Sequence, residues 1–129
     1  MNSVTHHAEE ILLIHGTFAS AAADRGDSWW QAQSEFWRFI KDGCAGRAAP
    51  ASVPFHWSGV NSDTHRQVAA AKLLQRLMST PDVGCHIVAH SHGGSVVFHA
   101  LCLAVERKLK LPTLKSWTTI GTPFLHYHI

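Results

Sequence analysis

One serine lies between small residues where a strand-like apolar segment gives way to a helix-like apolar segment. The five residues at this junction are Ala89, His90, Ser91, His92 and Gly93. Residues 85–89 have the composition of a buried parallel strand, and residues 93–108 place apolar side chains at helical spacing. A serine at such a junction projects from a sharp, strained turn, so the residues two before and two after it must be small. Ala89 and Gly93 meet that demand, and the junction therefore predicts a strand, a tight turn and a helix with Ser91 at the apex.

Segments of the two kinds alternate along the rest of the chain. Residues 11–14, 51–57, 85–89 and 114–120 are predicted strands, and helices are predicted over about 28–41, 64–79 and 93–108. The first helix is expected to be capped by Asp27 or Ser28 and to bury its aromatic side chains, with Trp30 left open as a ligand contact. Pro54 indicates an edge position for the second strand. Alternation at this spacing predicts the α/β class, with a parallel sheet, right-handed crossovers and helices on both faces.

Composition and charge limit the classes of protein that fit this chain. A length of 129 residues and a hydrophobic content of 46% indicate a single domain with a real core, preceded by a disordered tail over residues 1–10. The net charge of +2 and a basic group without interleaved aromatics argue against a nucleic-acid partner. The chain has three cysteines without a C-x-x-C pair and no signal peptide, which predicts a cytoplasmic protein. It has no apolar run near the roughly 20 residues that a membrane span needs, which predicts that it does not span a membrane.

Four loops are expected to meet at one edge of the sheet. In open parallel sheets, sites form where the strands end, and the loops over residues 15–19, 57–61, 90–93 and 121–124 all follow predicted strands. The backbone N–H of His92, at the start of a helix, would be one donor to an oxyanion that develops next to Ser91. This convergence predicts a functional site at that edge.

The A-x-S-x-G junction, together with an apolar strand that ends in His15 and Gly16, resembles the α/β-hydrolase superfamily in its serine esterase and lipase-like members. The resemblance covers residues 11–124 and aligns the four strands with the third to sixth of the eight-stranded fold, in the spatial order second, first, third, fourth. It implies a partial α/β-hydrolase fold, hydrolysis of a small-molecule or lipid carboxylic ester through an acyl-enzyme on Ser91, and no cofactor. It also implies a second oxyanion donor at the backbone N–H of Thr17, with Phe18 as the neighbouring candidate.

The catalytic acid and histidine of that family have no clear counterpart here. The one acid after Ser91 is Glu106, roughly 22 Å along the predicted helix, and His99 is roughly 12 Å along it. His126 and His128 follow the last strand and remain open as a base. The expectation is that the chain is the N-terminal part of a longer hydrolase, whose uncovered sheet edge could self-associate.

Three other interpretations stay open. Ser91 could be an ordinary helix cap without catalytic function. The spacing of His90 and His92 suits a metal, but the acid and further histidine of H-x-H zinc hydrolases do not follow, so no metal is expected. The chain could also be a non-catalytic interaction module that keeps part of the fold.

Overall fold

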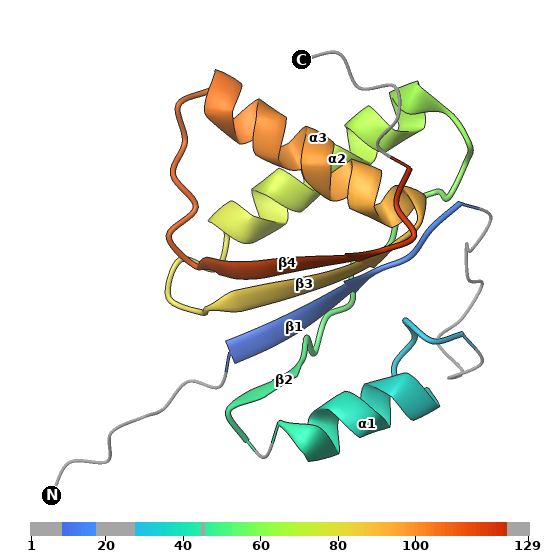
Figure 1. Ribbon diagram of the computed structural model, residues 1–129. Coiled ribbons are helices and arrows are strands. Elements are labelled where there is room, and N and C mark those ends of the chain that lie inside the picture. The colour runs from blue at the N-terminus through green and yellow to red at the C-terminus, as the bar shows by residue number, and fades with distance from the viewer. Residues whose placement is uncertain (1–8, 18–27, 45, 124–129) are drawn as a thin grey trace, which may run out of the picture.

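Four parallel strands form the sheet in a computed structural model that describes residues 9–17, 28–44 and 46–123 (Figure 1). The strands are β1 (Glu9–Ile14), β2 (Ala48–Pro50), β3 (Cys85–His90) and β4 (Leu114–Ile120). Their order in the sheet is β2-β1-β3-β4, and every neighbouring pair is parallel. The predicted α/β class and the predicted strand order are both confirmed.

Helices cover both faces of this sheet, as expected. Helix α1 (Glu35–Gly43) lies below it in Figure 1, and α2 (Asp63–Met78) and α3 (His92–Glu106) lie above it. Two hydrophobic clusters result because strand side chains alternate between faces. The larger cluster joins β1 and β3 to α2 and α3 through Leu12, Ile14 and Ile87, and the smaller joins Ile11 and Leu13 to the aromatic side of α1.

The first helix begins later than predicted. Ser34, not Asp27 or Ser28, is its N-cap, and the Ser34 hydroxyl accepts from the Trp37 N–H at 3.0 Å. Gln33 directly before it has a φ of 69°, a left-handed conformation that a continuous helix cannot contain. Ser28 instead closes a separate turn, in which the Gln31 N–H donates to its carbonyl oxygen at 2.9 Å. Asp27 lies outside the described residues.

The prediction of the second strand over residues 51–57 is wrong, since β2 ends at Pro50. Its last link to β1 is the Ala51 N–H, which donates to the Ile11 carbonyl at 2.9 Å. Phe55 and Trp57 are buried, but in an extended loop that leaves the sheet and packs against α2 and α3. Alternating burial in that loop imitates a strand. The edge position inferred from Pro54 nevertheless agrees with β2, which is the outer strand next to β1.

The other boundaries move by only a few residues. β1 begins at Glu9, so the two last residues of the expected N-terminal tail belong to the sheet, and residues 1–8 lie outside the described part. Cys44, Cys85 and Cys102 are free thiols. Burial, with the nearby Glu10 carboxylate, raises the pKa of Cys85 to about 11, so this thiol is a poor nucleophile.

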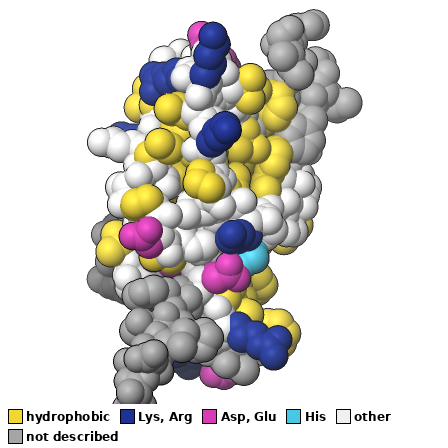
Figure 2. Space-filling model, turned by 90° about the vertical axis from the view of Figure 1, so that its left-hand side faces the viewer, with side chains coloured by type: hydrophobic (Ala, Val, Ile, Leu, Met, Phe, Trp, Pro, Cys, Tyr) yellow, Lys and Arg dark blue, Asp and Glu magenta, His cyan; other side chains and the backbone are white. Residues whose placement is uncertain are grey.

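The surface where the strands begin carries many apolar side chains. Figure 2 views this end of the molecule, and hydrophobic side chains gather in its upper part with Lys and Arg side chains among them. Val105 near the end of α3 is 78% exposed and Leu109 beyond it is 37% exposed. In the three ranges that the structure describes, no helix is both long enough and apolar enough to cross a membrane.

Candidate active site

Ser91 adopts a backbone conformation that few non-glycine residues adopt. Its φ is 53° and its ψ is −130°, at the turn between β3 and α3. This region is close to one that only glycine enters freely, and holding another residue there costs about 1–3 kcal/mol. The turn is held by β4, because the Ser91 N–H donates to the Ile120 carbonyl and the Thr122 hydroxyl donates to the Ser91 carbonyl, both at 2.8 Å. The predicted strand, tight turn and helix are therefore present.

The glycines beside Ser91 lie so close to neighbouring chain segments that a larger side chain would not fit. A Cβ on Gly93 would lie 2.5 Å from the Ile14 carbonyl oxygen and 2.6 Å from that of His15. A Cβ on Gly16 would lie 3.0 Å from the Ser91 Cβ. Ala89 is fully buried, between Ile14 on β1 and Thr119 on β4. These contacts confirm the packing argument that led from the sequence to the turn.

The loop after β1 lies beside the turn at Ser91 between β3 and α3, called the elbow below, as the sequence predicts. Gly16 and Thr17 line a hollow of about 300 Å³ together with His90 and Ser91. The remaining lining residues, Ser28, Trp29 and Trp30, precede α1. Of these three, the sequence leaves only Trp30 open as a ligand contact, and Ser28 and Trp29 were missed. Two further expectations for this edge, Phe18 and Phe124, fall outside the described residues.

His15 holds the loop after β1 from inside the protein. Its ring is fully buried and lies between Trp30, with centroids 4.5 Å apart, and Trp57, with centroids 5.5 Å apart. The Trp57 backbone N–H donates to His15 Nε2 at 3.3 Å, so Nε2 is unprotonated and Nδ1 carries the proton donated to the Gly16 carbonyl at 3.0 Å. Burial lowers the pKa of His15 and keeps the ring neutral.

This contact also orients the next peptide group. In a planar trans peptide the C=O and the following N–H point in opposite directions. Because the Gly16 carbonyl faces His15, the Thr17 N–H faces away from that ring. Trp57 locks the same loop through its indole N–H, which donates to the His15 carbonyl at 2.8 Å. The fold thus joins His15 and Trp57, which are 42 positions apart on neighbouring loops.

Thr17 and His92 carry the two backbone N–H groups that are expected to act as donors. No hydrogen bond between described residues uses either N–H. His92 is the first residue of α3, where the helix leaves its first N–H groups without intrahelical acceptors and carries a partial positive charge. The His92 ring lies 3.3 Å from the Ser95 hydroxyl. Partial burial, with the charge of Arg66, lowers its pKa.

A general base for Ser91 is not found in the described part of the chain. No hydrogen bond there reaches the Ser91 hydroxyl; His90 is exposed and packs edge-on to Trp29 at 6.0 Å. His99 Nε2 lies 3.4 Å from an Asp63 carboxylate oxygen. His126 and His128 lie outside the described residues, and Glu106 is the last residue of α3. The described residues also contain no group of three or more potential metal ligands, so His90 and His92 gain no third partner there.

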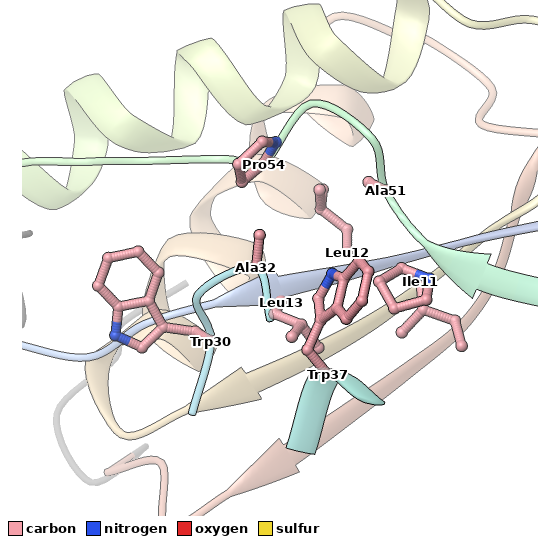
Figure 3. Close-up of a pocket in the computed structure, with 9 residues that line it drawn as sticks. Ile11, Leu12, Leu13, Trp30, Ala32, Trp37, Ala51 and Pro54 are labelled. Atoms are coloured by element: carbon pink, nitrogen blue, oxygen red, sulfur yellow. The ribbon is translucent and has the colours of Figure 1, made fainter. Parts of the chain in front are cut away.

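A second hollow lies on the α1 side of β1, where β2 has ended (Figure 3). Trp30 and Ala32 from the segment before α1, and Trp37 from α1, converge there on Leu13 of β1, with Pro54 at the far side. Its volume is about 20 Å³, which is room for about one water molecule. It is therefore a packing defect, and the hollow beside Ser91 is the better candidate for a substrate.

Comparison with known proteins adds no assignment. Neither the known protein-family models nor the curated proteins contain a match to this chain. The structure shows a small α/β domain with a four-stranded parallel sheet and a strained serine where one strand meets one helix.

Proposed function

We propose that the protein is a serine hydrolase of the esterase and lipase type, in which Ser91 attacks a carboxylic ester. The observation that carries this proposal is the conformation of Ser91. Ser91 stands at the start of a helix with a strained φ of 53°, and two hydrogen bonds to Ile120 and Thr122 hold it there. Strain of this kind persists where the surrounding structure enforces it, and functional sites are where it concentrates. An ordinary N-cap serine has extended backbone and a side-chain hydrogen bond to the helix, as Ser62 does for α2, and Ser91 has neither.

The proposed reaction is acyl transfer to the serine hydroxyl. The Ser91 Oγ attacks the ester carbonyl carbon, its proton passes to a base, and the carbonyl oxygen becomes an oxyanion between the Thr17 and His92 N–H groups. Cleavage of the C–O bond releases the alcohol and leaves the acyl-enzyme, which water then hydrolyses. The base would come from outside the described residues. The described part of the chain contributes the nucleophile, the two donors and the helix dipole that favours negative charge at this point.

The walls of the hollow favour an apolar acyl group. Trp29 and Trp30 line it together with Gly16 and Thr17. Trp29 contacts the exposed His90, and Trp30 is 3% exposed and lies against the His15 ring, with the two ring planes tilted by 37°. Aromatic walls with a few backbone donors are typical of small-molecule sites. We therefore propose a small-molecule or lipid ester as substrate.

Labelling with a fluorophosphonate tests the nucleophile. The reagent forms a covalent bond to an activated serine, and intact-protein and peptide masses locate it. We expect a label on the peptide that contains Ser91 in the wild-type chain, and none on that peptide in Ser91→Ala. Ser58→Ala is the matched control, since Ser58 is an exposed serine outside this site and its loss should leave labelling unchanged. Equal labelling of that peptide in wild type and Ser91→Ala, or no labelling of it in either, would contradict the proposal.

A second candidate function is a non-catalytic interaction module. The absence of a base for Ser91 among the described residues favours it, together with the edge of β4. Within the described sheet β4 pairs only with β3, and Ile120 on this edge strand is 50% exposed. An open edge invites pairing with another strand. Sedimentation would show whether the chain self-associates and whether Ile120→Lys abolishes that association. Self-association of this kind, together with absence of fluorophosphonate labelling, would favour this function over the first.

A further inference from the structure

Three side chains from three adjacent strands form a chain of hydrogen bonds far from Ser91. The Ser116 hydroxyl on β4 lies 2.7 Å from His86 Nδ1 on β3, and His86 Nε2 lies 3.0 Å from the Glu9 carboxylate on β1. His86 is five residues before Ser91 on an extended strand, or roughly 16 Å away. This cluster therefore belongs to a different part of the molecule from the site described above.

The sheet places the three side chains on one face. His86 is the β-partner of Ile11 on one side and of Ser116 on the other, and Glu9 lies two residues before Ile11 on the same face. An irregularity in the register sets the last pairing: Cys85 pairs with Leu114, yet His86 pairs with Ser116, so one residue of β4 is skipped. Bulges of this kind re-aim side chains and are frequent next to active sites. Without it, His86 would face Lys115.

The hydrogen bonds determine which way the proton can move. An ionised carboxylate only accepts, so His86 Nε2 carries a proton and donates it to Glu9. In the neutral ring His86 Nδ1 is then the unprotonated nitrogen, and the Ser116 hydroxyl donates to it. The order of groups is that of a serine, histidine and acid triad with the two ring nitrogens exchanged, and in such a triad the acid orients the ring and stabilises the imidazolium. The side chains of His86 and Glu9 are 31% and 40% exposed, and Ser116 is exposed, so a reagent can reach the hydroxyl.

Other serine and histidine pairs in the described chain lack one part of this arrangement. The Ser58 hydroxyl lies 3.0 Å from His65 Nδ1 and is equally exposed, but no carboxylate is bonded to the His65 ring. Ser95 is bonded to His92 but is fully buried. Ser58 is therefore a natural internal control for Ser116.

We infer that Ser116 is a second acyl-accepting serine, with His86 as its general base and Glu9 as the positioning residue. With an aryl ester, the Ser116 Oγ forms a bond to the carbonyl carbon while its proton passes to His86 Nδ1. The C–O bond to the aryl group then breaks, and the aryl oxide leaves with that proton as a phenol. No helix of the described chain begins at this point of the sheet to supply donors to an oxyanion. The inferred event is thus a single acylation of Ser116 by activated acyl donors, independent of any activity at Ser91.

The test uses p-nitrophenyl acetate on the Ser91→Ala chain, with peptide masses to follow acetylation of Ser116 and Ser58 separately. Ser116 should react faster than Ser58. His86→Ala should slow Ser116 by about 100-fold, the lower range for loss of a general base, while the rate at Ser58 stays the same. Added imidazole should restore part of that rate. Equal rates at the two serines, or a Ser116 rate that His86→Ala does not change, would overturn the inference.

Glu9→Gln completes the experiment without removing the histidine. The amide keeps the size of the side chain but loses the charge that balances an imidazolium, so acetylation of Ser116 should slow while Ser58 is unaffected. Glu9→Asp, which keeps the charge, should recover part of the rate. Circular dichroism of each variant checks that the sheet is intact. If His86→Ala is unfolded, the comparison of Glu9→Gln with Glu9→Asp decides, and equal rates in those two chains refute the inferred role of Glu9 and His86.

Discussion

Replacing Gly93 by alanine should destabilise the protein because two carbonyl oxygens occupy the space of the new methyl group. The added Cβ would lie 2.5 Å from the Ile14 oxygen and 2.6 Å from the His15 oxygen, whereas ordinary contact begins near 3.4 Å. Helix α3 and the end of β1 would have to separate by most of an ångström. Overpacking of this kind costs about 1–3 kcal/mol. Alanine recovers about 0.5–1 kcal/mol in helix propensity, so we expect a net loss of up to about 2.5 kcal/mol.

Gly43→Ala is the matched control for that variant. Gly43 is the last residue of α1 and is exposed, and a Cβ added to it would meet no other atom within 4 Å. The same chemical change there should be neutral or stabilising by up to about 1 kcal/mol. Urea unfolding followed by tryptophan fluorescence measures both. The fluorescence of folded Gly93→Ala should also shift, because the displaced His15 carbonyl accepts the Trp57 indole N–H. If Gly93→Ala proves as stable as Gly43→Ala, then the close approach of β1 and α3 at Gly93 does not require a glycine there, and the overpacking explanation is wrong.

Three further predictions concern the same part of the molecule. Ser91→Gly should raise the free energy of unfolding by about 1–2 kcal/mol, because glycine adopts a positive φ without strain, whereas Ser91→Ala should not; thermal unfolding of the two variants compares them. Burial lowers the pKa of His15 in the folded protein, whereas in the unfolded chain the ring takes up a proton near the usual pKa of 6.5. The free energy of unfolding should therefore fall as the pH drops below that value. Urea titrations at several pH values should show that this pH dependence weakens in His15→Gln and persists in His65→Gln. Thr122→Val removes the hydroxyl that donates to the Ser91 carbonyl and should cost about 1 kcal/mol, while Thr122→Ser keeps the donor and most of the stability; equal losses in both would point to the methyl group instead.

The strands and helices with strong patterns were predictable from local sequence. β4 is predicted with its observed bounds, and β3 and α3 within two residues, because continuous apolar runs leave few alternatives. The segment between β1 and α2 was not predictable in this way. Ser28 and Ser34 are both competent caps, and the positive φ of Gln33 that separates a turn from a helix is not visible in composition.

Part of the candidate site was also predictable. Gly16, Thr17, His90 and Ser91 lie together because strands that alternate with helices end at one edge of a parallel sheet. The wall formed by Trp29 was missed, because aromatic side chains at helical spacing indicate a core before they indicate a pocket. The hydrogen bond from Thr122 to Ser91 was missed because it joins residues 31 positions apart.

The sequence by itself determined where the chain must turn sharply and which residues there must be small. Gly93 shows that requirement most directly, since a methyl group on it would meet the backbone of β1 and of His15. The tertiary structure decided what surrounds the turn. Neutral His15 between two indole rings, and Glu9 joined through His86 to Ser116, depend on strand order and on a one-residue shift in register. Such contacts link distant residues, and hydrophobic periodicity carries no information about which polar side chains the sheet will place face to face.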